Sequence, residues 1–363
     1  MKTQATGNPI RRALDFGQSI WFDGLAAPGE FARMIREDGV RGATTNPTIF
    51  EKALSGGSDP EAGELLKRFS PEEAYQRMAI KAVGALADLF GEVYEETQGA
   101  DGYVSIEVDP HLAHDTSGTI RQARELHACL KRPNVMIKIP ATPAGIPAVE
   151  AVIADGIPVN VTLIFSVERY CEVMEAYLAG LARRAALGAG LGRVASVASF
   201  FVSRLDTAVD KLLAEKGDSA KPLAGRAGIA NSKIAYQEFR KNFSTGRFQK
   251  LAAAGARLQR PLWASTGTKN PAYSDVLYVE ELMGADTVNT LPPATYAAFR
   301  DHGRAGASIE QGHPGALETL AALRRLGIDM AAVTARLEEQ GVKLFTDSHN
   351  LLLQGLAAKK NAR

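Results

Sequence analysis

The sequence has 363 residues, of which 45% are hydrophobic and 23% are charged. Its 42 basic residues nearly balance its 41 acidic ones, so the net charge of +1 gives no electrostatic footprint for nucleic acid or for an anionic membrane surface. The two cysteines, Cys129 and Cys171, form no CxxC pair, which argues against a disulfide framework and a zinc site. Any anion that the chain binds is expected to be small and held by a local cluster.

No apolar signal core lies within residues 1–12, and no apolar run approaches the ~18 residues that would span a membrane. These features favour a soluble protein of the cytoplasm. No G-x-G-x-x-G opens a helix and no G-x-x-x-x-G-K-[ST] occurs, so no nucleotide cofactor is expected. We expect neither a cofactor nor a metal.

Short β-branched runs alternate with longer helical stretches, which is typical of a parallel sheet covered by helices. Eight strands close an α/β barrel, and eight are predicted here. They are Ser19–Asp23, Val40–Thr44, Tyr103–Asp109, Val135–Ile139, Pro158–Leu163, Val194–Val202, Leu262–Thr266 and Thr287–Thr290. We therefore predict a single (β/α)8 TIM-barrel domain over residues 1–363, with the barrel at about 15–300 and extra N- and C-terminal helices.

Two long helices are predicted inside the barrel, at Pro71–Glu96 and at Val167–Ala186, the second with Ser166 as its N-cap. After the last strand, Arg300–His313 is predicted to be a polar loop. The tail at about 301–363 then offers helices at Pro314–Leu326, Met330–Gln340 and Val342–Leu356, with breaks at Gly327 and Gly341. The tail has three open alternatives: to close over the barrel mouth, to pack beneath the barrel, or to meet a second subunit in a homodimer.

The fourth strand carries a lysine between two isoleucines, in Ile137-Lys138-Ile139. Side chains alternate along a strand, so Lys138 faces the barrel interior if the isoleucines face the helices. Desolvation favours the neutral amine, which is a nucleophile for a carbonyl carbon. The alternatives are a buried ion pair or a lysine that reaches solvent from an edge strand.

Carboxylates end two other strands. In the third strand Glu107 and Asp109 alternate with apolar residues and are expected to share the interior face, where Glu107 can serve as an acid/base through a water. The alternative for Glu107 is a structural partner for Lys138 or an arginine. Asp23 follows Trp21 and Phe22 at the end of the first strand, and its alternative role is to cap a helix near Pro28–Arg36.

Amides and hydroxyls end the second and fifth strands. Asn160 and Thr162 flank Val161 and so share one face, while Thr44 and Asn46 end the second strand, which alone indicates only a turn. Such groups suit hydrogen bonds to substrate hydroxyls and to a positioned water.

The later strands end in groups that suit a phosphate. Ser199 and Arg204 follow the sixth strand, and Ser265 and Lys269 lie in the run Ser265–Asn270 after the seventh. The late strands and loops of such barrels form the usual phosphate site, and arginine offers a bidentate fork. For Arg204 and Lys269 the alternative is ordinary surface charge. Together with Lys138 and the carboxylates, these groups suit Schiff-base cleavage of a phosphorylated ketose without a metal.

Two segments resemble the signatures of the transaldolase family. Gly42-Ala43-Thr44-Thr45-Asn46-Pro47-Thr48-Ile49-Phe50 is similar to the first, and Val135-Met136-Ile137-Lys138-Ile139-Pro140-Ala141-Thr142 followed by Gly145-Ile146 is similar to the second. The resemblance runs from about Asp15 to Pro292. It implies a transaldolase of the non-oxidative pentose phosphate pathway, which moves a dihydroxyacetone unit from sedoheptulose 7-phosphate or fructose 6-phosphate to erythrose 4-phosphate or glyceraldehyde 3-phosphate.

The resemblance also implies roles for single residues. Lys138 would form the Schiff base, Glu107 would act through a water held by Thr162, and Asp23 would move the proton of the hydroxyl at the cleaved bond. Asn46 and Asn160 would bind hydroxyls of the dihydroxyacetone unit, with Thr44 close by. Ser199 and Arg204 would hold the phosphate.

The chain departs from the best-known members after the seventh strand. Those members have Ser-Phe-Arg-Asn, with the arginine on the phosphate, whereas this chain has Ser265-Thr266-Gly267-Thr268-Lys269-Asn270 and resembles a longer bacterial subfamily. Lys269 would then replace the arginine without its bidentate fork.

Three other functions are alternatives. A related aldolase that releases free dihydroxyacetone resembles a shorter chain with glutamine at Glu107 and tyrosine at Phe201, so both residues favour the transaldolase. A non-catalytic barrel that binds sugar phosphates would not need Lys138, Glu107 and Asp23. A partnership with another enzyme of the pathway has no visible second domain to support it.

Overall fold

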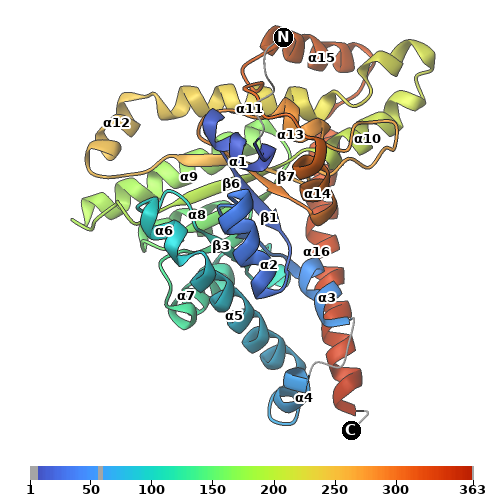
Figure 1. Ribbon diagram of the computed structural model, residues 1–363. Coiled ribbons are helices and arrows are strands. Elements are labelled where there is room, and N and C mark those ends of the chain that lie inside the picture. Colours follow the sequence, from blue (N-terminus) through green and yellow to red (C-terminus); the bar gives the residue numbers. More distant parts are fainter. Residues whose placement is uncertain (1–6, 56–59, 362–363) are drawn as a thin grey trace.

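The computed structural model describes residues 7–55 and 60–361 of the chain. Eight parallel strands close into one barrel in chain order, and helices surround it (Figure 1). The strands are β1 Gln18–Asp23, β2 Ala43–Thr44, β3 Val104–Glu107, β4 Val135–Pro140, β5 Val159–Ile164, β6 Ser196–Phe201, β7 Gln259–Ala264 and β8 Thr287–Leu291. The predicted (β/α)8 barrel with additional terminal helices is confirmed.

The helices connect consecutive strands and extend the chain at both ends. They are α1 Pro9–Arg12, α2 Pro28–Arg33, α3 Pro47–Ser55, α4 Pro60–Leu66, α5 Pro71–Leu89, α6 Gly91–Glu96, α7 Thr116–Leu130, α8 Gly145–Ala154, α9 Val167–Ala186, α10 Ser203–Ala214, α11 Ala227–Phe243, α12 Gly246–Ala253, α13 Leu277–Glu281, α14 Pro293–His302, α15 His313–Arg325 and α16 Met330–Asn361, with the short helical turns η1 Ala13–Phe16, η2 Met34–Asp38, η3 Pro110–Leu112 and η4 Asp218–Leu223. Within the described ranges, no helix is both long and apolar enough to cross a membrane.

Apolar strand faces and helix faces share one continuous core. Ile137 and Ile139 of β4 are fully buried in it, as are Val159 and Val161 of β5. The opposite faces of these strands point into the barrel, where polar side chains lie. The alternation of side chains in the sequence therefore correctly predicts which residues of both strands face the barrel interior.

Several expected boundaries differ from the structure. β2 is shorter than expected, and β7 begins three residues before Leu262 and ends at Ala264, because Ser265 adopts a left-handed conformation with a φ of 56° that ends the strand. The single helix expected at Pro71–Glu96 divides into α5 and α6 at the buried Phe90. The loop expected at Arg300–His313 begins only after α14 ends at His302.

The C-terminal tail closes over the barrel mouth. α16 packs against α3, and Figure 1 shows the two helices side by side. The break expected at Gly341 was wrong, because α16 continues through this residue to Asn361. A Cβ atom at Gly341 would lie 2.9 Å from the Leu163 side chain, so glycine lets the helix approach the end of β5. Of the three alternatives for the tail, closure over the mouth is the one observed.

Candidate active site

Three neighbouring strands bring an acid, an amine and an amide to one level of the barrel. Glu107 of β3 is the register partner of Lys138 in β4, and Lys138 is the register partner of Asn160 in β5. Lys138 is only 4% exposed and Asn160 is fully buried. Parallel pairing without a bulge at these positions therefore places the three side chains beside one another on the interior face.

The Lys138 ammonium lies in a nearly dry environment. Its Nζ is 3.5 Å from Glu107 Oε2 and donates a hydrogen bond of 3.3 Å to the Thr45 carbonyl. The ring of Phe345, from α16, has its centroid 5.7 Å from the same nitrogen. The alternative that Lys138 reaches solvent from an edge strand is wrong, because β4 pairs with β3 and β5 on its two sides.

Two buried oxygens beside Lys138 have hydrogen-bonding capacity to spare. Glu107 Oε2 and Thr162 Oγ1 have no hydrogen-bond partner among the residues that the structure describes. Burial raises the pKa of Glu107 to about 7, although the positive charge of Lys138 opposes the rise. Buried polar atoms generally need a partner, so both oxygens are suited to a water or a substrate group. A carboxyl group that titrates near neutral pH can also give and take protons.

Asp23 ends β1 on the other side of the mouth. Thr44 donates a hydrogen bond of 2.6 Å to Asp23 Oδ1, and the Thr44 hydroxyl also lies 2.7 Å from that of Thr290. Burial raises the pKa of Asp23, with Lys138, Thr44 and Arg204 opposing the rise. The capping alternative for Asp23 is wrong, because Ala27 occupies the cap position of α2.

Asn160 is held by a chain of hydrogen bonds across three strands. Its Nδ2 donates to Ser105 Oγ at 2.9 Å, and its Oδ1 accepts from Ser199 Oγ at 2.7 Å. All three residues are at most 2% exposed. The network fixes the orientation of the amide and joins β3 to β6 beneath the mouth.

A cavity of about 540 Å³ opens at the carboxyl ends of the strands. Ten of the twelve residues singled out in the sequence line it: Asp23, Thr44, Asn46, Lys138, Thr162, Ser199, Phe201, Arg204, Ser265 and Lys269. Asn160 and Glu107 do not line the cavity. Asn160 is fully buried, and Glu107 contacts Lys138, which does line it. This is the face of an α/β barrel on which substrates bind.

Arg204 and Lys269 bring positive charge to the cavity. The Arg204 guanidinium lies over the Phe201 ring, with its carbon 5.3 Å from the ring centroid, and burial lowers its pKa while Asp23 and Glu107 oppose that change. Lys269 is exposed at the rim, and the Ser265 hydroxyl lies 3.0 Å from that of Ser203. Cations and hydroxyls in one wall suit a phosphate group.

The sequence reasoning missed two residues of the cavity wall. Lys52, on α3, adds another exposed cation at the rim, and Phe345, on α16, covers Lys138. A single lysine in an amphipathic helix carries no sequence signal. Phe345 could not be found either, since its place over the mouth depends on how the tail packs.

Asp109 does not share the interior face with Glu107, contrary to the expectation. β3 ends at Glu107, and Asp109 caps η3 by accepting a hydrogen bond of 2.9 Å from the His111 backbone. The side chain lies outside the cavity, so two carboxylates rather than three accompany Lys138. Alternation holds only while the chain stays extended.

Both signature segments have local structural reasons. Asn46 Oδ1 accepts a hydrogen bond of 3.0 Å from the Ile49 backbone and caps α3, with Pro47 at the first helical position. A Cβ atom at Gly145 would lie 1.9 Å from the Pro140 carbonyl, so only glycine allows α8 to begin so close to the end of β4. These contacts hold Asn46 and Lys138 at the mouth.

The fold and this cavity define an α/β-barrel enzyme with a buried amine at its polar mouth. Residues 20–356 match the family model described as transaldolase/fructose-6-phosphate aldolase. The chain belongs to this family.

Curated relatives are similar over nearly the whole chain. Transaldolase 1 of Streptomyces coelicolor is 47% identical, over 99% of this chain and 97% of its own. The transaldolases of Mycolicibacterium smegmatis and Thiobacillus denitrificans are 48% and 47% identical, over 98% and 93% of this chain and 98% and 96% of their own. The expected transaldolase function is confirmed, and sugar phosphates fit as substrates.

Proposed function

We propose that the chain transfers a dihydroxyacetone unit between sugar phosphates through a Schiff base on Lys138. The donor is sedoheptulose 7-phosphate or fructose 6-phosphate, and the acceptor is erythrose 4-phosphate or glyceraldehyde 3-phosphate. The observation that carries the assignment is the buried Lys138 side chain, whose ammonium lies 3.5 Å from Glu107 and which lines the cavity. A lysine held in this way is both shielded from water and open to a ligand.

The first step joins donor and enzyme. The neutral amine of Lys138 attacks the ketose carbonyl carbon, and the resulting carbinolamine loses its hydroxyl group as water to give the iminium ion. Glu107 accepts and returns protons in this step through a water that the Thr162 hydroxyl orients. Glu107 Oε2, which forms an ion pair with Lys138, and Thr162 Oγ1 both lack a hydrogen-bond partner among the described residues. They support this role because both have room for the water's hydrogen bonds.

The second step breaks the bond between the third and fourth carbons of the donor. Asp23 removes the proton of the fourth-carbon hydroxyl, the bond's electron pair moves into the iminium ion, and the aldose leaves. The three-carbon enamine stays on Lys138 until an acceptor aldehyde arrives and the steps run in reverse. The raised pKa of Asp23 supports this role, because such a carboxylate is a stronger proton acceptor.

The remaining polar groups of the cavity hold the substrate. Thr44, Asn46 and Asn160 bind hydroxyls of the three-carbon unit near Lys138. The phosphate lies against Ser199, Arg204, Ser265 and Lys269. All of these residues except the buried Asn160 line one cavity, which supports their role in binding the substrate.

Transfer is favoured over release of free dihydroxyacetone. Glu107 is a carboxylate, which exchanges protons with a bound water as an amide cannot. Phe201 lines the cavity beside Arg204 and presents an apolar ring where a hydroxyl would hold water. Slow release of dihydroxyacetone by water remains as a side reaction.

We assign the enzyme to the cytoplasm and expect a homodimer without nucleic-acid partners. The near-neutral net charge supports the absence of nucleic acid. The exposed Leu351 of α16 supports self-association. Light scattering on a sizing column measures the mass, and a monomer at micromolar concentration would contradict the dimer.

A transfer assay tests the function. The wild type should convert fructose 6-phosphate and erythrose 4-phosphate to glyceraldehyde 3-phosphate and sedoheptulose 7-phosphate. Lys138→Ala should lower turnover by about 10⁴-fold or more, since the nucleophile is gone, while its circular dichroism stays native. Turnover by Lys138→Ala at the wild-type rate would refute the role of Lys138.

A further inference from the structure

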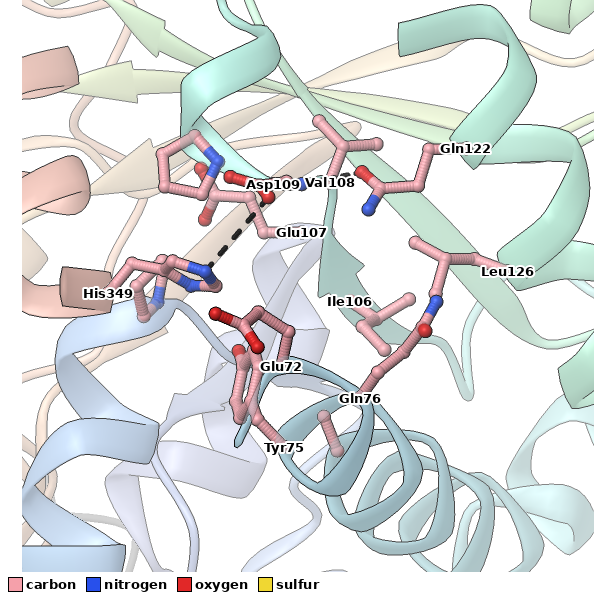
Figure 2. A pocket seen from close by; sticks show the side chains of 13 residues that line it. Glu72, Tyr75, Gln76, Ile106, Glu107, Val108, Asp109, Gln122, Leu126 and His349 are labelled. Atoms are coloured by element: carbon pink, nitrogen blue, oxygen red, sulfur yellow. Dashed lines mark hydrogen bonds and ion pairs between the residues drawn. The ribbon is translucent and has the colours of Figure 1, made fainter. Parts of the chain in front are cut away.

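A second, smaller pocket lies on the outer side of Glu107, away from the active-site cavity. It has a volume of about 100 Å³ and is lined by residues of α5, the end of β3 and α16. Figure 2 shows Asp109 and His349 pointing toward each other across it, with Glu72 and Tyr75 on the wall formed by α5. The proposed transfer reaction uses none of these four residues.

Asp109 and His349 line this pocket, and a second imidazole, that of His111, lies beside them just outside it. His111 Nδ1 lies 2.7 Å from Asp109 Oδ1, and His349 Nε2 lies 4.0 Å from Asp109 Oδ2. Asp109, His111 and His349 can each offer one ligand atom such that all three atoms lie within 4.8 Å of one another. In a tetrahedral zinc site the ligand atoms lie about 3.3 Å apart. The His111–Asp109 pair is closer than this and the His349–Asp109 pair is farther apart, so metal binding requires a small rotation of both imidazoles.

His349 is buried and has a ring nitrogen without a hydrogen-bond partner among the described residues. It is only 5% exposed, and the nitrogen is Nδ1. The ring lines the pocket and contacts the rings of Tyr75 and His111, with centroids 5.3 Å and 5.6 Å away. The ring nitrogen that faces Asp109 is Nε2, and imidazole nitrogens are common metal ligands. Coordination through Nε2 leaves Nδ1 free to donate a hydrogen bond to a water, as the second nitrogen of a metal-bound histidine usually does.

We propose that Asp109, His111 and His349 bind a divalent transition-metal ion. Two histidines with one carboxylate suit zinc and its first-row neighbours better than magnesium or calcium, which prefer oxygen ligands. Glu72, which lines the same pocket, adds negative charge. A water completes the coordination.

The ion would join two parts of the chain that lie far apart in the sequence. Asp109 and His111 belong to the turn after β3, and His349 belongs to α16. His349 lies four residues after Phe345, so the two side chains share one face of the helix. Ser348, whose hydroxyl lies 2.8 Å from that of Thr48, already holds this part of α16 at the mouth. Metal binding would therefore fix α16, and Phe345 with it, over Lys138.

The test is zinc binding by the full chain without a histidine tag. The protein is first freed of metal with a chelator and then titrated with Zn²⁺ in a calorimeter. The wild type should bind about one ion per chain, and its melting temperature should rise with Zn²⁺. His111→Ala and His349→Gln should each weaken binding by roughly 10-fold or more, since loss of even an outer partner has that effect.

His302→Ala is the matched control. His302 is also exposed and lies beside two carboxylates, Asp275 and Asp301, at 2.9 Å and 3.1 Å. This variant should bind zinc like the wild type. His111→Ala decides alone if His349→Gln fails to fold, because the exposed His111 side chain is not part of the core. No binding by the wild type, equal binding by His111→Ala, or an equal loss in His302→Ala would overturn the proposal.

Discussion

Two groups of buried carboxylates in this molecule differ in how fully they are partnered. Asp38, at the end of η2, is 1% exposed and receives hydrogen bonds from Asn8, Arg33, Tyr296 and Arg300. Burial raises its pKa, but Tyr296 and the two arginines outweigh burial, so the pKa is lowered overall. Asp38 thereby ties the N-terminal segment and α2 to α14.

In Glu107 and Asp23, the effect of burial on the pKa outweighs the effect of nearby charges and hydrogen bonds. Burial dominates both, so their pKa values are raised, and Glu107 Oε2 has no hydrogen-bond partner in the described part of the chain. A carboxylate whose hydrogen-bonding capacity is fully used stabilises the fold but is not available to bind a substrate. A carboxylate with bonds left open is available to a substrate, at some expense in stability. Sequence alone does not separate the two kinds.

Among the changes that test this comparison of carboxylates, the largest effect should follow from making Glu107 unable to carry a proton. Glu107→Gln keeps the shape of the side chain but removes its acid/base capacity, so turnover should fall by ~10²–10⁴-fold. Steady-state kinetics on folded protein measures this. An unchanged rate would contradict the distinction between the two groups of carboxylates.

The pH dependence sharpens the same point. The pKa of Glu107 is raised to about 7, so the carboxylate form that accepts a proton is lost as the pH falls through this value. The rate of the wild type should therefore decline below about pH 7 in chelator-treated buffer. The residual rate of Glu107→Gln should lack this decline, and a decline common to both would assign it to another group.

Asp38→Asn should affect stability rather than chemistry. It removes the charge that Arg33 and Arg300 surround, and the free energy of unfolding should fall by about 2–3 kcal/mol. The lowered pKa means that the stabilisation is present above the unfolded value near 3.8 and is lost as the pH falls below it. Denaturant unfolding should show a larger difference from the wild type at pH 7 than at pH 3. A loss of turnover in folded Asp38→Asn would contradict the comparison.

Phe201→Tyr should shift the outcome of the reaction by a smaller factor. The ring lines the cavity with Lys138 and Thr162, so a new hydroxyl would hold water near the three-carbon intermediate. Release of free dihydroxyacetone from fructose 6-phosphate should rise by about 10-fold, the effect of one hydrogen bond. Phe201→Leu serves as the control without a hydroxyl, and equal release from both variants would assign no role to the hydroxyl.

Lys269→Ala should have the smallest effect. Its ammonium is exposed at the rim, where water screens the attraction to a phosphate, so KM should rise by about 2–5-fold with little change in kcat. Lys216→Ala, an exposed lysine that does not line the cavity, is the control. A KM equal to that of the wild type would remove Lys269 from the phosphate site.

The barrel and most of its cavity could be predicted because both follow from local patterns. Alternation along β4 and β5 gave the sidedness of Lys138, Asn160 and Thr162, and parallel strands in chain order then bring their ends together. The failures have two physical causes, a strand that ends earlier than expected and packing between segments that lie far apart in the sequence. Asp109 turned away because β3 ended, and α16 continued through Gly341 because Leu163 lies against that residue. Phe345 and Lys52 needed the packed structure to be found.

Borohydride trapping tests the central claim most directly. The wild type is incubated with saturating fructose 6-phosphate, reduced with borohydride, digested and mapped by mass spectrometry. We predict a reduced three-carbon adduct on the peptide that contains Lys138, and none in Lys138→Ala. Folded wild type without an adduct, or with the adduct on another lysine such as Lys52, would contradict the account.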